Sequence, residues 1–178
     1  IQPLTVRKLP TGFYQIIAGE RRWRAARMAG LREVPVTVIE ADDKTAMELA
    51  LIENLQRADL DPIEEARGYQ QLMQEYGMTQ SGVAERVGKS RPAVANALRL
   101  LALSAPVLDM VAGGAISAGH ARAILTLTDE HAQLAVAQKV RNLQLSVRQT
   151  ELMCKNMAKP AKKAPPPAPA VDYIAVCE

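Results

Sequence analysis

In the first third of the chain, short hydrophobic runs alternate with longer segments in which polar and apolar residues mix. Three of the runs are rich in β-branched or aromatic residues and predict strands, at residues 4–8, 13–18 and 34–39. Residues 20–29, which end before Gly30, and residues 44–57 have the composition of helices. This pattern predicts a small α/β domain with mixed strands over residues 1–57.

From residue 61 onward the strand pattern disappears and helix-capping signals repeat. Asp61 to Glu64 reads as a capping box with proline at the first helical position, and the helix that it opens is expected to end at Gly77. A second capping box, Ser146 to Gln149, opens the last helix. Further helix starts are predicted near Thr79, Ser90, Pro106, Ser117 and Thr128. The sequence therefore predicts an all-helical domain over residues 58–157.

The composition changes after residue 157. Residues 158–170 contain five prolines in thirteen residues, which predicts an extended linker without a packed core. Residues 171–178 are apolar again and are expected to begin a third domain. Because the sequence opens inside a predicted strand and without methionine, we expect it to be a piece of a longer protein.

Composition excludes several classes of protein. The chain has 178 residues, of which 48% are hydrophobic and 23% charged, enough for one or two small cores. No apolar run approaches the roughly 20 residues of a membrane-spanning helix. Two cysteines and two histidines leave no room for a disulfide framework or a clustered metal site. With no secretory signal at its start, the chain is expected in the cytosol.

The net charge of +3 is modest, but the positive charges are clustered. Residues 20–32 hold five arginines against the single acid Glu20, and residues 86–99 hold four cations and no acid. Two basic clusters predict two contacts with anionic partners, or two contacts with one partner. On charge alone, a pair of solvated helix faces explains them equally well.

Residues 79–101 have the pattern of a helix-turn-helix, with a short helix, a turn at residues 88–90 and a second capped helix. Lys89, Ser90 and Arg91 are placed at the start of the second helix, where recognition helices meet bases and phosphates. An ordinary helical hairpin is the alternative, and the acid-free basic turn favours DNA. After the predicted cap at Ser117, Arg122 has the chemistry to bind a guanine edge. For His120, a packed histidine at a helix start is the favoured interpretation.

A strand runs through Gly19 directly into the arginine-rich helix. Glycine permits close backbone approach, and the free N–H groups of a helix start bind anions. Arg21 and Arg22 add forked donors that suit phosphate. This chemistry fits a polyphosphate, although the segment is not a Walker A loop. A basic surface helix near DNA is an equally good interpretation of the spacing.

The next helix ends in a carboxylate, two amides and an arginine, at residues 53–57. Such a set can hold a magnesium ion, a phosphate oxygen and a water, because Mg²⁺ prefers oxygen ligands and arrives with phosphates. Taken alone, polar capping is the favoured explanation, with Arg57 complementing the helix dipole.

Four segments together resemble the ParB family of chromosome and plasmid partition proteins. Residues 17–26 (IAGERRWRAA) are similar to its arginine motif and residues 53–57 (ENLQR) to its second nucleotide motif. Residues 88–92 (GKSRP) are similar to the turn of its helix-turn-helix, and residues 117–122 (SAGHAR) to a later DNA-binding helix. The segments follow the family's order and spacing, and the resemblance covers residues 1 to about 157. The first nucleotide motif and the C-terminal dimerisation domain of the family would lie outside this fragment.

The resemblance implies an α/β nucleotide-binding domain followed by an all-α helix-turn-helix domain. It implies a DNA clamp that binds the palindromic parS site, binds CTP and Mg²⁺, slides after closing, and hydrolyses CTP slowly as a weak CTPase. It also implies a ParA-type ATPase as partner, a homodimer, and a cytoplasmic, nucleoid-associated location in a bacterium.

The resemblance also implies roles for individual residues. CTP would contact Gly19, Glu20, Arg21, Arg22, Glu53, Asn54, Gln56 and Arg57. Glu53 would support hydrolysis, and Glu53 and Asn54 would bind the metal. DNA would contact Gln80, Lys89, Ser90, Arg91, Pro92, Ala93, Asn96, Gly119, His120 and Arg122.

Two other classes of function compete with a partition clamp. One is a helix-turn-helix transcriptional repressor with a regulatory first domain, as in KorB-like proteins, or a nucleoid-occlusion protein of the Noc type. The other is a free-standing enzyme on the first domain, because sulfiredoxin resembles that fold. Sulfiredoxin needs a catalytic cysteine there, and both Cys154 and Cys177 lie outside residues 1–57, which excludes this enzyme.

Overall fold

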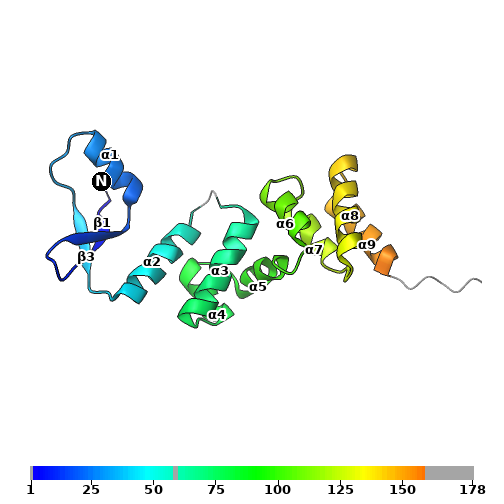
Figure 1. The fold of residues 1–178 in the computed structure, drawn as a ribbon, viewed down its shortest axis with the longest axis horizontal. Coiled ribbons are helices and arrows are strands. Elements are labelled where there is room, and N and C mark those ends of the chain that lie inside the picture. The colour runs from blue at the N-terminus through cyan, green and yellow to red at the C-terminus, as the bar shows by residue number, and fades with distance from the viewer. Residues whose placement is uncertain (1, 58–59, 159–178) are drawn as a thin grey trace, which may run out of the picture.

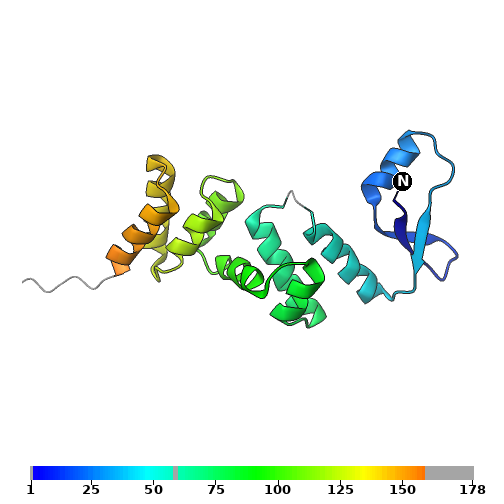
Figure 2. The same ribbon diagram turned by 180° about the vertical axis from the view of Figure 1, so that it is seen from behind.

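The computed structural model describes residues 2–57 and 60–158, and it has an elongated shape (Figures 1 and 2). A small sheet with one covering helix forms one end, and the remaining helices follow one another along the long axis. The predicted order of an α/β region followed by an all-helical region is confirmed. No helix among the described residues is long and apolar enough to cross a membrane.

The sheet has three strands in the order β2-β1-β3. β1 (Leu4–Lys8) and β2 (Tyr14–Ala18) form an antiparallel hairpin, and β3 (Val36–Ile39) lies parallel to β1. Parallel neighbours need a crossover connection, which α1 (Glu20–Met28) supplies. The second and third strands begin one and two residues later than predicted, and α1 ends one residue earlier.

A buried arginine joins the sheet to the next helix, α2 (Asp43–Leu55). Arg7 on β1 is only 8% exposed. Its Nε donates to Gln15 Oε1 at 2.7 Å, its Nη1 donates to the Ala41 carbonyl at 3.3 Å, and its Nη2 pairs with the Asp43 carboxylate. One side chain therefore connects β1, β2 and the start of α2. The predicted helix at 44–57 begins one residue earlier and ends at Leu55.

Seven further helices make up the rest of the described chain. They are α3 (Pro62–Tyr76), α4 (Gln80–Val87), α5 (Arg91–Leu100), α6 (Ala105–Ala112), α7 (Ala118–Ile124), α8 (Glu130–Leu143) and α9 (Val147–Ala158).

Most predicted helix caps are confirmed. Asp61, Thr79, Ser90 and Ser117 each accept a backbone N–H at the start of a helix, and Ser146 forms the predicted box with Gln149. The helix expected near Pro106, α6, begins one residue before it, at Ala105, and the helix expected near Thr128, α8, begins at Glu130 with Asp129 as its cap. The reciprocal half of the first box is not formed, since Glu64 does not bond back to Asp61.

The helices enclose two hydrophobic cores. The first core lies where α2, α3, α4 and α5 meet, and its buried residues are Ile52, Leu55, Tyr69, Leu72, Val83, Ala84, Val87 and Val94. The second core is built mainly by α6 to α9 and includes the buried thiol of Cys154, which forms no disulfide. The end of α2 therefore packs into the helical region, so the ENLQR segment at residues 53–57 and the helix-turn-helix share one core.

The predicted linker and third domain, residues 158–178, lie outside the described residues apart from Ala158, the last residue of α9. The division into domains at residues 57 and 157 stays a prediction.

Candidate functional site

A cavity of about 330 Å³ opens at the start of α1, beside the end of α2. It is lined by Gly19, Glu20, Arg21, Arg22, Glu53 and Arg57. These are six of the eight residues that sequence similarity assigned to a nucleotide, and they come from two helices distant in sequence. Asn54 and Gln56, the other two, do not line this cavity.

Gly19 shapes the mouth of the cavity. Its φ of +103° lies in the left-handed region that favours glycine. A Cβ at this position would lie 2.7 Å from Leu4 Cδ2, a distance that real Cβ contacts do not show. Gly19 is also the N-cap of α1 and provides no side-chain cap, so the first N–H groups of α1 remain open to a ligand.

Arg22 has two neighbours at once. Its Nη1 donates to the carbonyls of Gln2 at 2.9 Å and Pro3 at 2.8 Å, which holds the segment before β1. Its Nη2 lies beside Gly19, 3.1 Å from the position of a Cβ there. Since a guanidinium carries five N–H donors, Arg22 has donors left for an anion while it holds the strand.

The charges around the cavity suit a phosphate group that arrives with a cation. Three arginines provide forked donors, and two glutamates provide oxygen ligands. Among the described residues no three His, Cys, Asp or Glu side chains cluster closely enough to hold a metal ion by themselves. A cation that arrives with a phosphate ligand would share its coordination with that ligand.

The Gln56 side chain makes a contact outside the cavity at Gly19. Its Nε2 donates to the Arg86 carbonyl at 3.2 Å, and the Arg86 guanidinium lies 3.8 Å from Glu48. The end of α2 is thereby tied to α4, the first helix of the helix-turn-helix. Asn54 is exposed at the same end of α2, outside the cavity at Gly19. The assignment of these two residues to the nucleotide stays a prediction.

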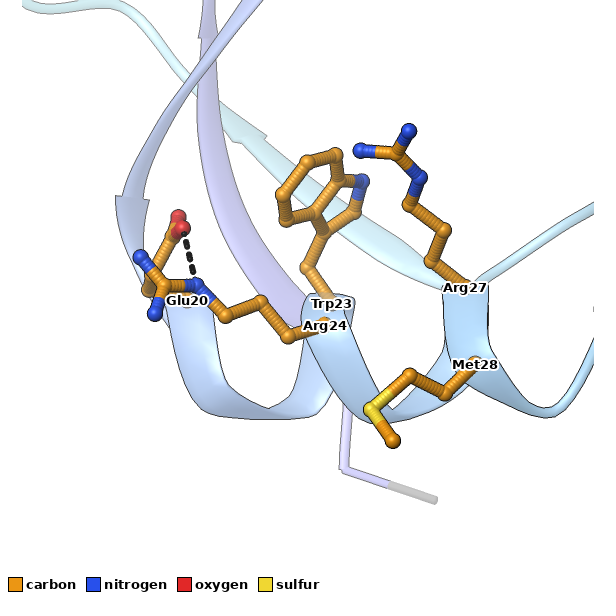
Figure 3. A pocket seen from close by; sticks show the side chains of 5 residues that line it. All are labelled: Glu20, Trp23, Arg24, Arg27 and Met28. Atoms are coloured by element: carbon orange, nitrogen blue, oxygen red, sulfur yellow. Dashed lines mark hydrogen bonds and ion pairs between the residues drawn. The ribbon is translucent and has the colours of Figure 1, made fainter.

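A second cavity, of about 610 Å³, lies on the outer side of α1 (Figure 3). It is lined by Glu20, Trp23, Arg24, Arg27 and Met28. Both cations here already have neighbours, because Arg24 Nε donates to Glu20 at 3.0 Å and Arg27 lies over the Trp23 ring at 5.6 Å. Despite its size, this cavity therefore offers less to a phosphate than the one at Gly19.

In the helical region, five predicted DNA-binding residues converge on one groove of about 440 Å³ between α5 and α7. We call it the α5–α7 groove, and its predicted DNA contacts are Ser90, Pro92, Ala93, Asn96 and Arg122. Ser90 Oγ accepts the Ala93 N–H at 3.3 Å and caps α5. α5 has no acid in its own first turn, so the residues of this turn leave the positive end of the helix able to attract an anion.

The remaining predicted contacts lie around the groove. Lys89 and Arg91 are exposed beside the start of α5, and Gln80 is the first residue of α4. Lys89 also lines a separate cavity of about 300 Å³ that includes Arg57.

One acidic residue at the groove was missed by sequence reasoning. Glu65 of α3 lines the α5–α7 groove, and its Oε1 accepts the hydroxyl of buried Tyr69 at 2.5 Å. Burial, followed by this hydrogen bond, raises the pKa of Tyr69 well above its ordinary value. The phenol thereby fixes the position of the carboxylate. The sequence alone gave no sign that an acid on α3 would face the recognition helix.

Gly119 and His120 have intramolecular roles that the DNA assignment did not include. A Cβ at Gly119 would lie 3.0 Å from Val147 Cγ2, so the glycine permits a close approach of α9. His120 Nδ1 accepts the Ser117 N–H at 3.2 Å, so Nε2 carries the proton and donates to the Leu145 carbonyl at 2.9 Å. Both ring nitrogens are engaged, in agreement with the packed-histidine interpretation.

Known proteins share this architecture. A family model described as the ParB HTH domain matches residues 58–159, and one described as the ParB N-terminal domain matches residues 1–55. The chromosome-partitioning protein ParB of Myxococcus xanthus is 51% identical over 98% of this chain and 60% of its own length. The chromosome-partitioning protein Spo0J of Thermus thermophilus is 52% identical over 95% of this chain and 62% of its own length.

A solved structure agrees with these sequence relatives. The C-terminally truncated ParB of Caulobacter crescentus, complexed to the centromeric parS site, has a TM-score of 0.81 and 47% identity, over 88% of this chain and 83% of that one. The chain thus spans about three fifths of the length of the two partitioning proteins and most of the truncated one. The two family models match residues 1–55 and 58–159 in that order, and the chain belongs to the ParB family.

Proposed function

We propose that this chain binds parS DNA through the α5–α7 groove and the basic start of α5. The observation that carries the proposal is the convergence of five predicted contacts on one groove, at the positive end of a recognition helix. The similarity to a ParB complexed to parS supports it. Arg122 provides a bidentate donor, whose contact with the correct base is worth about 1–3 kcal/mol of discrimination.

A binding titration with two duplexes tests this proposal. We expect tight binding to a parS duplex and weaker binding to a scrambled duplex of equal length and composition. The affinity should fall steeply with salt, with a slope of about −0.9 per phosphate contact. Equal affinity for both duplexes at moderate salt would contradict the proposal.

We propose a second activity, nucleotide binding, for the cavity at Gly19. Arg21, Arg22 and the open N–H groups of α1 would hold the phosphates, and CTP is the nucleotide that ParB similarity implies. Glu53 provides an oxygen donor that fits Mg²⁺, which would neutralise phosphate charge when bound, whereas a role for Asn54 in holding the metal rests on the family resemblance alone. Glu53 lines the cavity and is the candidate for supporting slow CTP hydrolysis.

A titration with CTP, ATP, GTP and UTP in the presence of Mg²⁺ tests the second activity, with and without a parS duplex. Binding confined to CTP is the expected result. Equal binding of all four nucleotides would contradict the base preference, and no binding with parS present would leave the chain a DNA-binding protein without a nucleotide switch.

Together the two activities correspond to a clamp that a nucleotide closes around DNA, with a ParA-type ATPase and a second copy of the protein as partners. A helix-turn-helix repressor or a nucleoid-occlusion protein is the alternative. Nucleotide-dependent sliding away from parS separates these possibilities, because a repressor stays at its operator. Retention on a closed circular duplex but loss from a linear one, only with CTP, would support the clamp.

A further inference from the structure

The starts of three helices lie next to one another in the helical region. In both views α7 lies between α5 and α9 along the long axis (Figures 1 and 2). Ala118 and Arg122 of α7 line the α5–α7 groove together with Ser90 and Ala93 at the start of α5. On its other side, α7 packs against α9. The predicted DNA-binding surface therefore has a further helix directly beside it.

Gly119 and His120 fix the start of α9 against the start of α7. Val147, the first residue of α9, contacts Gly119 so closely that a Cβ there would stand 3.0 Å from Val147 Cγ2. His120 Nε2 donates to the carbonyl of Leu145 in the turn before α9. The second residue of α7 therefore lies against the first residue of α9. Gly119 and His120, which the family resemblance assigned to DNA, therefore make contacts within the protein.

Arg148 is the second residue of α9 and follows Val147 directly. Its side chain is exposed, and it has no hydrogen-bond or ion-pair partner within the described part of the chain. The first turns of α5, α7 and α9 contain no acid, whereas those of α3 and α8 do. An unpaired guanidinium at the start of a helix that packs against α7 has the chemistry of a phosphate contact.

We infer that Arg148 is a further DNA contact, which binds a backbone phosphate and extends the surface of the α5–α7 groove onto α9. In this arrangement Gly119 and His120 act as positioning residues, because they set where α9 begins. The inference rests on the proposed DNA-binding function. It adds a residue outside the helix-turn-helix and outside the SAGHAR segment at residues 117–122.

The test is a salt titration of parS binding by the full chain and by Arg148→Gln. The matched control is Lys155→Gln, which removes the same charge from the same helix two turns further from Gly119. We expect Arg148→Gln to bind parS about 10-fold more weakly and to lower the salt slope by about 0.9, because one charge-assisted phosphate contact is lost. Lys155→Gln should match the wild type, and Arg148→Lys should keep the slope.

Two results would overturn the inference. One is an Arg148→Gln affinity and slope equal to those of the wild type, and the other is an equal loss in Arg148→Gln and Lys155→Gln, which would indicate bulk charge. Failure of the proposed function itself is separate, since the wild type would then not prefer parS to the scrambled duplex. Thermal melting of each variant checks that folding is intact.

Discussion

The sheet region and the helical region use their arginines in different ways. In the sheet region Arg7 and Arg22 donate hydrogen bonds to the protein itself, to side chains and carbonyls of three neighbouring segments. In the helical region the side chains of Arg91 and Arg122 have no such partner among the described residues and are exposed.

The difference follows from the packing of each region. The helical region has two cores made of apolar side chains, and neither Arg91 nor Arg122 adds a hydrogen bond or ion pair to them among the described residues. The sheet has few buried apolar residues and leaves Tyr14, Val36 and Val38 at least 44% exposed. It therefore relies on arginine hydrogen bonds for part of its stability. A mutation of an arginine in the sheet region should affect folding and binding together, whereas one on the helical face should affect binding alone.

The largest expected effect concerns the first core. Leu72 is fully buried where α2, α3, α4 and α5 meet. Leu72→Ala should lower the free energy of unfolding by about 3 kcal/mol, through lost burial and the cavity left behind. Urea unfolding measures this loss, with Leu31→Ala, at a 48% exposed site in the sheet region, as the control. Equal losses at the two sites would remove the contrast between the regions.

A smaller loss is expected for the buried arginine of the sheet. Arg7→Ala removes three donors to Gln15, Ala41 and Asp43, and it should cost about 2 kcal/mol, because the Asp43 side chain is largely exposed and its ion pair is screened. Lys8→Ala, at the exposed next position, is the control. Hydrogen exchange should show lost protection in β1 and β2. Unchanged protection in the Arg7→Ala variant would show that the sheet does not depend on this residue.

The smallest effect concerns pH and the cap of α2. Asp42 accepts the Thr45 N–H at 2.8 Å, and its hydrogen bonds to Thr45 hold its pKa below the ordinary value. A carboxyl group whose pKa is lowered in the folded state stabilises the fold at pH values above its ordinary pKa of about 4. That contribution is lost as the pH falls below about 4. Asp42→Asn should therefore lose less stability than the wild type between pH 5 and pH 3 in thermal melts. Equal losses of thermal stability in Asp42→Asn and the wild type over this pH range would contradict this role of Asp42.

Much of the fold could be predicted from the sequence because its signals are local. The caps at Asp61, Thr79 and Ser90 depend on side chains within three residues of the groups that they bind. Val83, Ala84 and Val87 lie on one face of α4 by helical periodicity, and all three are buried. Where two capping residues are adjacent, as at Thr128 and Asp129, the sequence could not decide between them.

The candidate site was harder to predict because it depends on contacts between distant segments. The cavity at Gly19 joins α1 to Glu53 and Arg57, and the motifs predicted this only through family resemblance. Neither the burial of Arg7 in a strand nor the approach of Val147 to Gly119 has a signal in the local sequence. A residue that acts through a tertiary contact, such as Gly119, therefore looks like a ligand-binding residue until the fold is known.

The most direct test of the account is a paired titration of Arg22→Ala and Arg122→Ala with CTP plus Mg²⁺ and with a parS duplex. We predict that Arg22→Ala loses CTP binding and some thermal stability but keeps parS affinity. Arg122→Ala should lose parS affinity, by about 10-fold or more for a lost bidentate contact, while it keeps CTP binding and the wild-type melting temperature. If either variant lost both ligands, or if Arg122→Ala melted earlier than Arg22→Ala, the proposed separation of the two regions would be contradicted.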